Sequence, residues 1–207
     1  MNDLLIFILI LLSIASCTEK KDTAYVPEEF KIYTVFNEGT WWIYEEVLSG
    51  EKDSSFVFSS KTRILNHRSL SYKQEMIEQQ TVRKKDTIYQ LTYPSDKLIE
   101  GLYLYTYKEE NRRNFSFPMT LLPYPIDSIG QQVPFQGGAV ITAIEEKIII
   151  QNQTYLNTIS VSFDRAVAEN GNPPWKIRSC TFAQNIGMIR IQYYDGTIWE
   201  LVDYKII

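Results

Sequence analysis

The side chains that most often carry enzymatic chemistry are few in this chain. His67 is the only histidine, and it stands in a polar stretch between Asn66 and Arg68. A Ser-His-Asp triad could be built only through His67, and no G-x-S-x-G motif marks a nucleophilic serine. The Gly residues form no dinucleotide-binding or phosphate-binding loop. We therefore predict no catalytic residue and no enzyme activity, and we keep a hydrolase without a recognisable motif as an alternative.

The acidic residues occur largely as adjacent pairs, which are poorly suited to act as catalytic dyads. Adjacent side chains of a strand point to opposite faces, so the carboxylates of Glu45-Glu46 or Glu145-Glu146 would not converge. Two cysteines, one histidine and no D-x-D-x-D-G loop supply no recognisable metal-binding motif. We expect neither a metal nor a cofactor.

The residue with the most specific chemical assignment is Cys17. Leu4 to Ile14 is an apolar run of eleven residues interrupted only by Ser13, and Ala15-Ser16-Cys17 and a charged stretch follow it. A run of this length is typical of the hydrophobic region of an export signal, because a membrane-spanning helix needs about 20 apolar residues.

The segment Ile14-Ala15-Ser16-Cys17 resembles the bacterial lipobox. The resemblance implies cleavage before Cys17, a diacylglycerol on its thiol, and a signal peptide over residues 1–16. The alternative is an ordinary secretory signal in which Cys17 is incidental. Thr18 follows Cys17, where the enterobacterial retention signal would have Asp, so we expect a lipid-anchored protein of the outer membrane. Cys180, the only other cysteine, is most simply a small core residue.

The remaining chain has the composition of a β protein. Between residues 17 and 207, 73 residues are Ile, Val, Thr, Tyr, Phe or Trp, against 6 Ala. Residues 88–93 and 102–107 alternate with period two, which predicts strands. Asp195-Gly196 lies between two alternating runs and predicts a terminal hairpin with a type I′ turn. Residues 49–53 predict a second hairpin, and the ambiguous stretch 72–82 is assigned to a strand because its neighbours are β-rich.

These patterns predict one domain rather than two. Residues 17–29 are polar and are expected to form a tether, and residues 30–207 a single all-β domain. The Pro-rich stretch 117–138 is expected to be an ordered crossing segment between two halves of one structure. The predicted fold is a curved antiparallel sheet or a partly open barrel, with little helix.

Two short motifs resemble those of small uncharacterised lipoproteins of Bacteroidetes-type Gram-negative bacteria. The first is the Gly-x-x-Trp-x-Tyr element of Gly39, Trp42 and Tyr44, and the second is the strand opening Asn185-Ile186-Gly187-Met188-Ile189. The resemblance runs from about residue 30 to 204. It implies an all-β domain and a membrane-anchored location, and it implies no catalytic residues.

Tyrosines at period two are the remaining candidates for binding. Tyr103, Tyr105 and Tyr107 would share one face of a strand, and Leu102 and Leu104 the opposite face. Such a tyrosine stripe either fills a core or lines a surface for a ligand. A net charge of −4 does not favour binding to the negatively charged backbone of nucleic acid, so we expect no nucleic-acid partner.

The sequence therefore predicts a membrane-anchored lipoprotein whose β domain binds a hydrophobic small molecule, a glycan or a protein. A structural or assembly subunit of an envelope complex is the alternative from a different class.

Overall fold

The computed structural model describes residues 22–66, 72–83, 86–93, 101–107, 119–123, 126, 128–130, 139–163 and 177–207. Within these ranges it contains one short helix and twelve strands, which confirms the all-β class. The elements in chain order are β1 (Thr23–Ala24), α2 (Glu28–Thr34), β2 (Trp41–Glu46), β3 (Lys52–Leu65), β4 (Lys73–Arg83), β5 (Asp86–Tyr93), β6 (Gly101–Tyr107), β7 (Met119–Pro123), β8 (Val140–Ile150), β9 (Gln153–Ser162), β10 (Ile177–Ala183), β11 (Gly187–Tyr193) and β12 (Ile198–Lys205).

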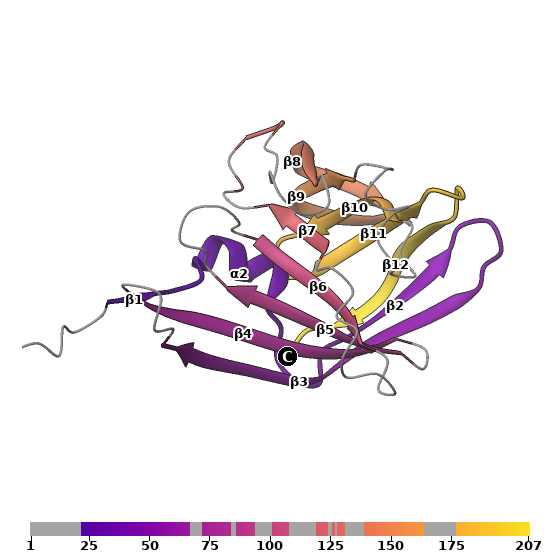
Figure 1. The fold of residues 1–207 in the computed structure, drawn as a ribbon. Coiled ribbons are helices and arrows are strands. Elements are labelled where there is room, and N and C mark those ends of the chain that lie inside the picture. Colours follow the sequence, from indigo (N-terminus) through magenta and orange to yellow (C-terminus); the bar gives the residue numbers. More distant parts are fainter. Residues whose placement is uncertain are drawn as a thin grey trace, which may run out of the picture.

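The described strands belong to one sheet, in the order β7-β6-β5-β4-β3-β2-β12-β11-β10-β9-β8 (Figure 1). All neighbours in this order pair antiparallel, and β2 with β12 joins the N-terminal strands to the C-terminal ones. β1 adds to the sheet by parallel pairing with β4. The described residues of β7 and β8 do not pair with each other, so the sheet is curved but open, as predicted.

Alternation along the strands explains why one face of the sheet is buried. In β2, Trp42, Tyr44 and Glu46 are buried, whereas the three residues that alternate with them are only half-buried. The period of two comes from the pleat, which sends successive side chains to opposite faces. The stretch assigned to a strand at residues 72–82 forms β4, and the alternating runs at 88–93 and 102–107 lie in β5 and β6.

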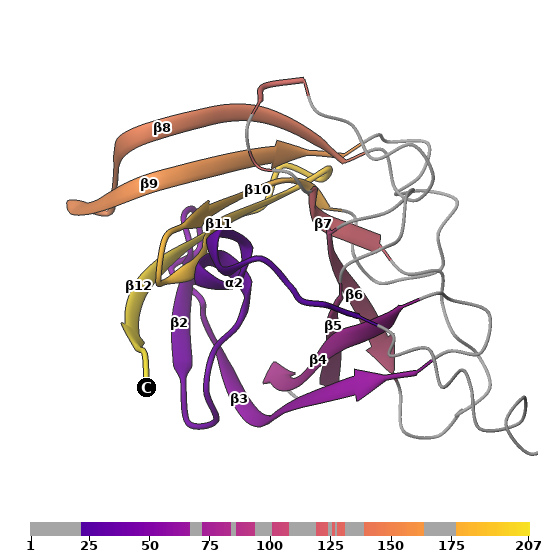
Figure 2. The same ribbon diagram turned by 90° about the vertical axis from the view of Figure 1, so that its left-hand side faces the viewer.

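The short helix α2 lies inside the curve of the sheet (Figure 2). Phe30 and Thr34 on this helix are buried, and so is Val26 just before it. The sequence predicts a tether up to residue 29, but Thr23 and Ala24 already pair with Lys73 and Gln74. Among the described residues, the packed domain therefore begins at Thr23 and not at residue 30.

Buried polar contacts with β4 hold this N-terminal segment. The Glu75 carboxylate accepts a hydrogen bond from Val26 N at 2.8 Å. It also forms an ion pair with Lys31 Nζ at 3.3 Å. Burial disfavours the charge of Lys31, but hydrogen bonds to Glu28 and Glu75 outweigh this effect and raise the pKa of Lys31. The local composition of this segment is polar, which is why its sequence resembles a tether. The contacts with β4 depend on residues far along the chain and cannot be found from that composition.

Both predicted hairpins are present. β2 and β3 form the first, and β11 and β12 form the second around Asp195-Gly196. The predicted type I′ turn is wrong, because that turn needs a positive φ at both central residues and only Gly196 has one, at +92°. Gly196 N donates to Tyr193 O, and Tyr193 N donates to Thr197 O. This pattern is a three-residue loop with a type I turn and a glycine bulge.

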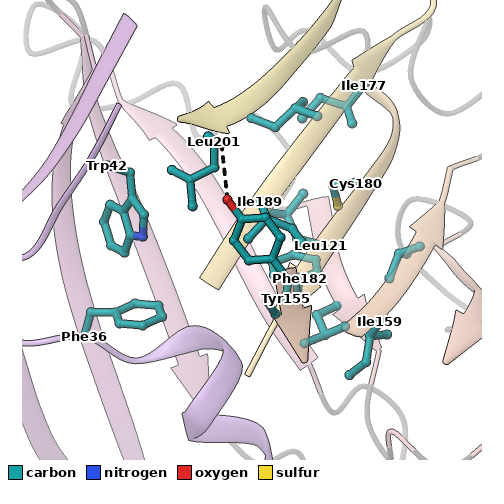
Figure 3. Packing of buried hydrophobic residues seen from close by; sticks show 14 of the residues in the cluster. Phe36, Trp42, Leu121, Tyr155, Ile159, Ile177, Cys180, Phe182, Ile189 and Leu201 are labelled. Atoms are coloured by element: carbon teal, nitrogen blue, oxygen red, sulfur yellow. Dashed lines mark hydrogen bonds between the residues drawn. The ribbon is translucent and has the colours of Figure 1, made fainter. Parts of the chain in front are cut away.

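The core lies between the strands of the C-terminal half, β2 and the helix. Figure 3 shows the Tyr155 ring among aliphatic side chains, close to Ile189 and Leu201. Cys180 is buried there without a disulfide partner among the described residues, as predicted for a small core residue. Burial raises the pKa of its thiol, so the uncharged form is favoured.

The β8–β9 hairpin reaches strand β12, which is not its neighbour in the sheet. Gln151 Nε2 donates to Glu200 Oε2 at 2.9 Å, and Gln153 Nε2 donates to Val202 O at 3.0 Å. The Tyr155 hydroxyl lies 3.2 Å from Leu201 O (Figure 3). These contacts connect β8 and β9, at one end of the strand order, with β12 near its middle.

Candidate functional site

The predicted tyrosine face lies on β6, whose backbone pairs with β5 and β7. Directly paired residues form rows across a sheet, and the members of a row share a face. The row that contains Tyr107 continues through Thr87 and Val82 to Phe56. Phe56 is 43% exposed. The side chains of β6 are outside the described residues, so the exposure of Tyr103, Tyr105 and Tyr107 stays a prediction.

The rows that alternate with the tyrosine rows contain buried side chains. The row that contains Leu102 continues through Thr92 to Ile77, and both of these side chains are buried. On its other side, Leu102 pairs with Leu122, which is also buried. The register is therefore compatible with a leucine face toward the core and a tyrosine face away from it.

Strand β3 contributes two aromatic side chains that sequence analysis did not single out. Phe56 and Phe58 are exposed on either side of Val57, which is buried. Phe58 is the additional residue of a bulge, since Val57 pairs with Thr81 and Ser59 with Gln80. The Phe-Val-Phe alternation in residues 56–58 is the signal that could have identified them. We call Phe56, Phe58 and the half-buried Trp41, which pairs with Phe56, the outer aromatic face.

Polar side chains lie in the rows that lead from β6 toward β3. The Tyr105 row passes through Tyr89 to Gln80, and the Tyr103 row passes through Leu91 to Glu78. Gln80 Nε2 donates to Glu78 Oε1 at 3.1 Å, and Arg63 lies 3.9 Å from the Glu78 carboxylate. Aromatic rings beside amide and carboxylate groups can stack on a ligand and hydrogen-bond its polar edge.

The carboxylates of the adjacent pair Glu45-Glu46 have separate partners. Glu46 is buried and accepts hydrogen bonds from Ser49 and Leu48, which lower the pKa of its carboxyl group. Glu45, on the opposite face of β2, forms an ion pair with Lys52 at 3.5 Å. Glu46 thus stabilises the β2–β3 turn, and Glu45 pairs with a lysine on the neighbouring strand. Glu145 and Glu146 are both exposed on β8.

Two of the residues considered for chemistry, His67 and Cys17, lie outside the described residues. Within the described ranges, His, Cys, Asp and Glu residues form no group that could hold a metal ion. The helix in those ranges is too short to cross a membrane.

The two motifs of the lipoprotein resemblance meet in the interior. Trp42 Nε1 donates to Ile186 O at 2.6 Å, and the Tyr44 hydroxyl donates to Met188 O at 2.8 Å. Gly187 lies against the rings of Phe36 and Trp42, whose centroids are 5.0 Å apart in an edge-to-face arrangement. Both motifs therefore secure β2 to the start of β11, which is a structural role.

No protein-family model, curated protein or solved structure matches this chain.

Proposed function

We propose that this protein is a lipoprotein anchored to the outer membrane through Cys17, with a non-enzymatic β domain that binds a ligand. The observation that carries the anchor is the apolar run Leu4 to Ile14 directly before Ile14-Ala15-Ser16-Cys17. The first paired residue, Thr23, follows Cys17 by six residues in the sequence, so cleavage before Cys17 would keep every described strand in the mature chain.

The ligand surface that we propose is the outer aromatic face together with Tyr103, Tyr105 and Tyr107. Its support is the exposure of Phe56 and Phe58 and the register that links Phe56 to Tyr107. Exposed aromatic rings on one sheet face suit a hydrophobic small molecule or the apolar face of a sugar, and a protein segment could use the same surface.

Membrane fractionation of bacteria that express the full chain tests the anchor. The wild-type protein should be in the membrane fraction and should need detergent for extraction. Cys17→Ser should be released from the membrane or retain its uncleaved signal. If wild type and Cys17→Ser partition identically as mature proteins, the anchor is contradicted.

Three tyrosine substitutions test the ligand surface. Tyr103, Tyr105 and Tyr107 changed together to Ala should reduce binding to an apolar naphthalene dye or to a glycan array, with little loss of stability. Leu104→Ala is the matched control, because its row passes through Gln90 to the buried Gln79. A truncated leucine at a buried site costs about 2–5 kcal/mol. An unfolded tyrosine variant beside a stable Leu104→Ala would show that the tyrosines belong to the core.

A second candidate function is an assembly subunit, and exposed residues of the β8–β9 hairpin favour it. Ile144, Ile149 and Leu156 are exposed there, and β8 is an end strand of the described sheet. End strands with apolar side chains can pair with another chain. Replacement of Ile149 by Lys should then release a copurifying envelope subunit, while the tyrosine variant should retain it.

A further inference from the structure

The proposed anchor at Cys17 limits how far the domain can stand from the membrane. Only residues 18–22 separate Cys17 from the first paired residue, Thr23. A fully extended chain spans at most about 3.6 Å per residue, so Thr23 lies within about 22 Å of the acylated residue. The anchor therefore keeps the end of the domain that carries β1 near the lipid surface. This step rests on the proposed function.

Two exposed apolar side chains lie at this end. Tyr25 follows β1 directly and is 63% exposed, and Ile64 near the end of β3 is 48% exposed. They lie on either side of the start of β4, because β1 pairs with Lys73 and Gln74 on one edge of this strand and Ile64 pairs with Glu75 on the other. Figure 1 shows β1 beside the corresponding ends of β3 and β4.

Two cationic residues lie at the same end of the sheet. Lys73 pairs with Thr23 of β1, and Arg63 precedes Ile64 with a side chain that is 54% exposed. The ion pair of Arg63 with Glu78 is long, at 3.9 Å, and weak at such exposure. Exposed aromatic and aliphatic residues with cations at the same end of a domain suit the boundary between lipid headgroups and acyl chains.

We propose that Tyr25 and Ile64 insert into the headgroup region of the membrane that holds Cys17, with Arg63 and Lys73 at the lipid phosphates. The occupant of this patch is the bilayer surface, because the length of the preceding chain brings that surface within reach. The domain is then held in one orientation, and β6 runs away from the membrane from Gly101 toward Tyr107, since Gly101 pairs with Tyr93 at the end of β5.

Leu48 provides a control that separates this geometry from simple hydrophobic adhesion. It is 89% exposed in the β2–β3 turn and is therefore more exposed than Tyr25. The turn precedes Lys52, at the opposite end of β3 from Ile64. If exposure alone governed membrane contact, Leu48 would insert, whereas the short connection from Cys17 requires Tyr25 and Ile64 to insert.

The test uses full-length acylated protein in vesicles of phosphatidylethanolamine and phosphatidylglycerol. Tyr25→Cys, Ile64→Cys and Leu48→Cys each carry an environment-sensitive fluorophore, while Cys180 is buried and Cys17 is blocked by its lipid. Nitroxide-labelled lipids should quench the fluorophores at positions 25 and 64 and leave the one at 48 bright. Circular dichroism checks that each labelled variant is folded. Because positions 25 and 64 are labelled in separate variants, the test still works if one of the two variants does not fold.

Two results would overturn the orientation. One is quenching at position 48 that equals or exceeds quenching at 25 and 64, and the other is no quenching at any position although the protein floats with the vesicles. A protein that does not float with the vesicles contradicts the anchor itself, and the orientation falls with it.

Discussion

Gly187 and Gly196 have the same backbone φ of +92° but different surroundings. A Cβ atom on Gly187 would lie 2.9 Å from Phe36 Cζ, whereas a Cβ on Gly196 would meet no atom within 4 Å. Both positions disfavour a side chain because φ is positive, but only Gly187 would also disturb the core.

We predict that Gly196→Ala lowers the free energy of unfolding by about 1 kcal/mol, which reflects the left-handed backbone alone. Gly187→Ala should cost an additional ~1–3 kcal/mol, because the aromatic ring of Phe36 must move. Urea denaturation of both variants measures the difference. Equal losses would show that the contact of Gly187 with Phe36 is not close in solution.

Tyr155 allows a prediction about alkaline pH. Burial, followed by the charges of Tyr204 and Glu200, raises its pKa to about 12, compared with about 10 for an unfolded chain. A raised pKa means that the folded state favours the neutral phenol. Its contribution to stability is complete below pH 10 and is lost as the pH rises toward 12.

Tyr155→Phe should therefore weaken the fall in stability between about pH 10 and 12. At neutral pH the variant should lose about 1 kcal/mol, since the hydroxyl lies within hydrogen-bond distance of Leu201 O and Gln153 Oε1. Denaturation of wild type and variant across this range measures both effects. Identical slopes would mean that Tyr155 ionises in the folded protein as freely as in the unfolded chain.

At the scale of elements, the strands could be predicted from the sequence and the helix could not. Alternation marks β5 and β6 because a half-buried strand needs a period of two. Helix α2 has only seven residues, a length at which local propensity is too weak to form a stable helix. Its ion pair with Glu75 joins Lys31 to a residue 44 positions away, where no local pattern can indicate it.

The burial of α2 predicts a large effect of one substitution. Phe30→Ala should lower the free energy of unfolding by about 3–5 kcal/mol, because the ring is fully buried inside the curved sheet. Tyr25→Ala, in the same segment but exposed, should stay within about 0.5 kcal/mol of wild type. Thermal denaturation compares the two. A nearly neutral Phe30→Ala would mean that the segment is indeed a tether, as its composition suggests.

The turn around Asp195-Gly196 shows a finer limit of sequence analysis. The dipeptide correctly indicates where the chain reverses, because glycine at a positive φ is required by several kinds of tight turn. It does not determine which kind. The hydrogen bonds of Tyr193 with Gly196 and Thr197 select the bulged loop, and they depend on the register of β11 with β12.

At the scale of the whole molecule, the sequence predicts one curved, open sheet but not its strand order. The pairing of β2 with β12 joins residues about 160 positions apart, and it depends on side chains that meet only in the fold, such as Trp42 with the carbonyl of Ile186. The aromatic candidates were likewise only partly found. Tyrosines at period two are visible in the sequence, and the Phe-Val-Phe alternation of residues 56–58 is visible too, but only the fold shows that both phenylalanines are exposed and Val57 is buried.

Mass spectrometry of the mature N-terminus tests the central claim most directly, which is that a lipid on Cys17 holds this β domain at a membrane. The full-length chain is expressed in a bacterium that processes lipoproteins and is extracted from the membrane fraction with detergent. We predict that its N-terminal peptide begins at Cys17 and carries the mass of a diacylglycerol and no residue before it. An unmodified N-terminus at another residue, in protein from the same fraction, would contradict the account.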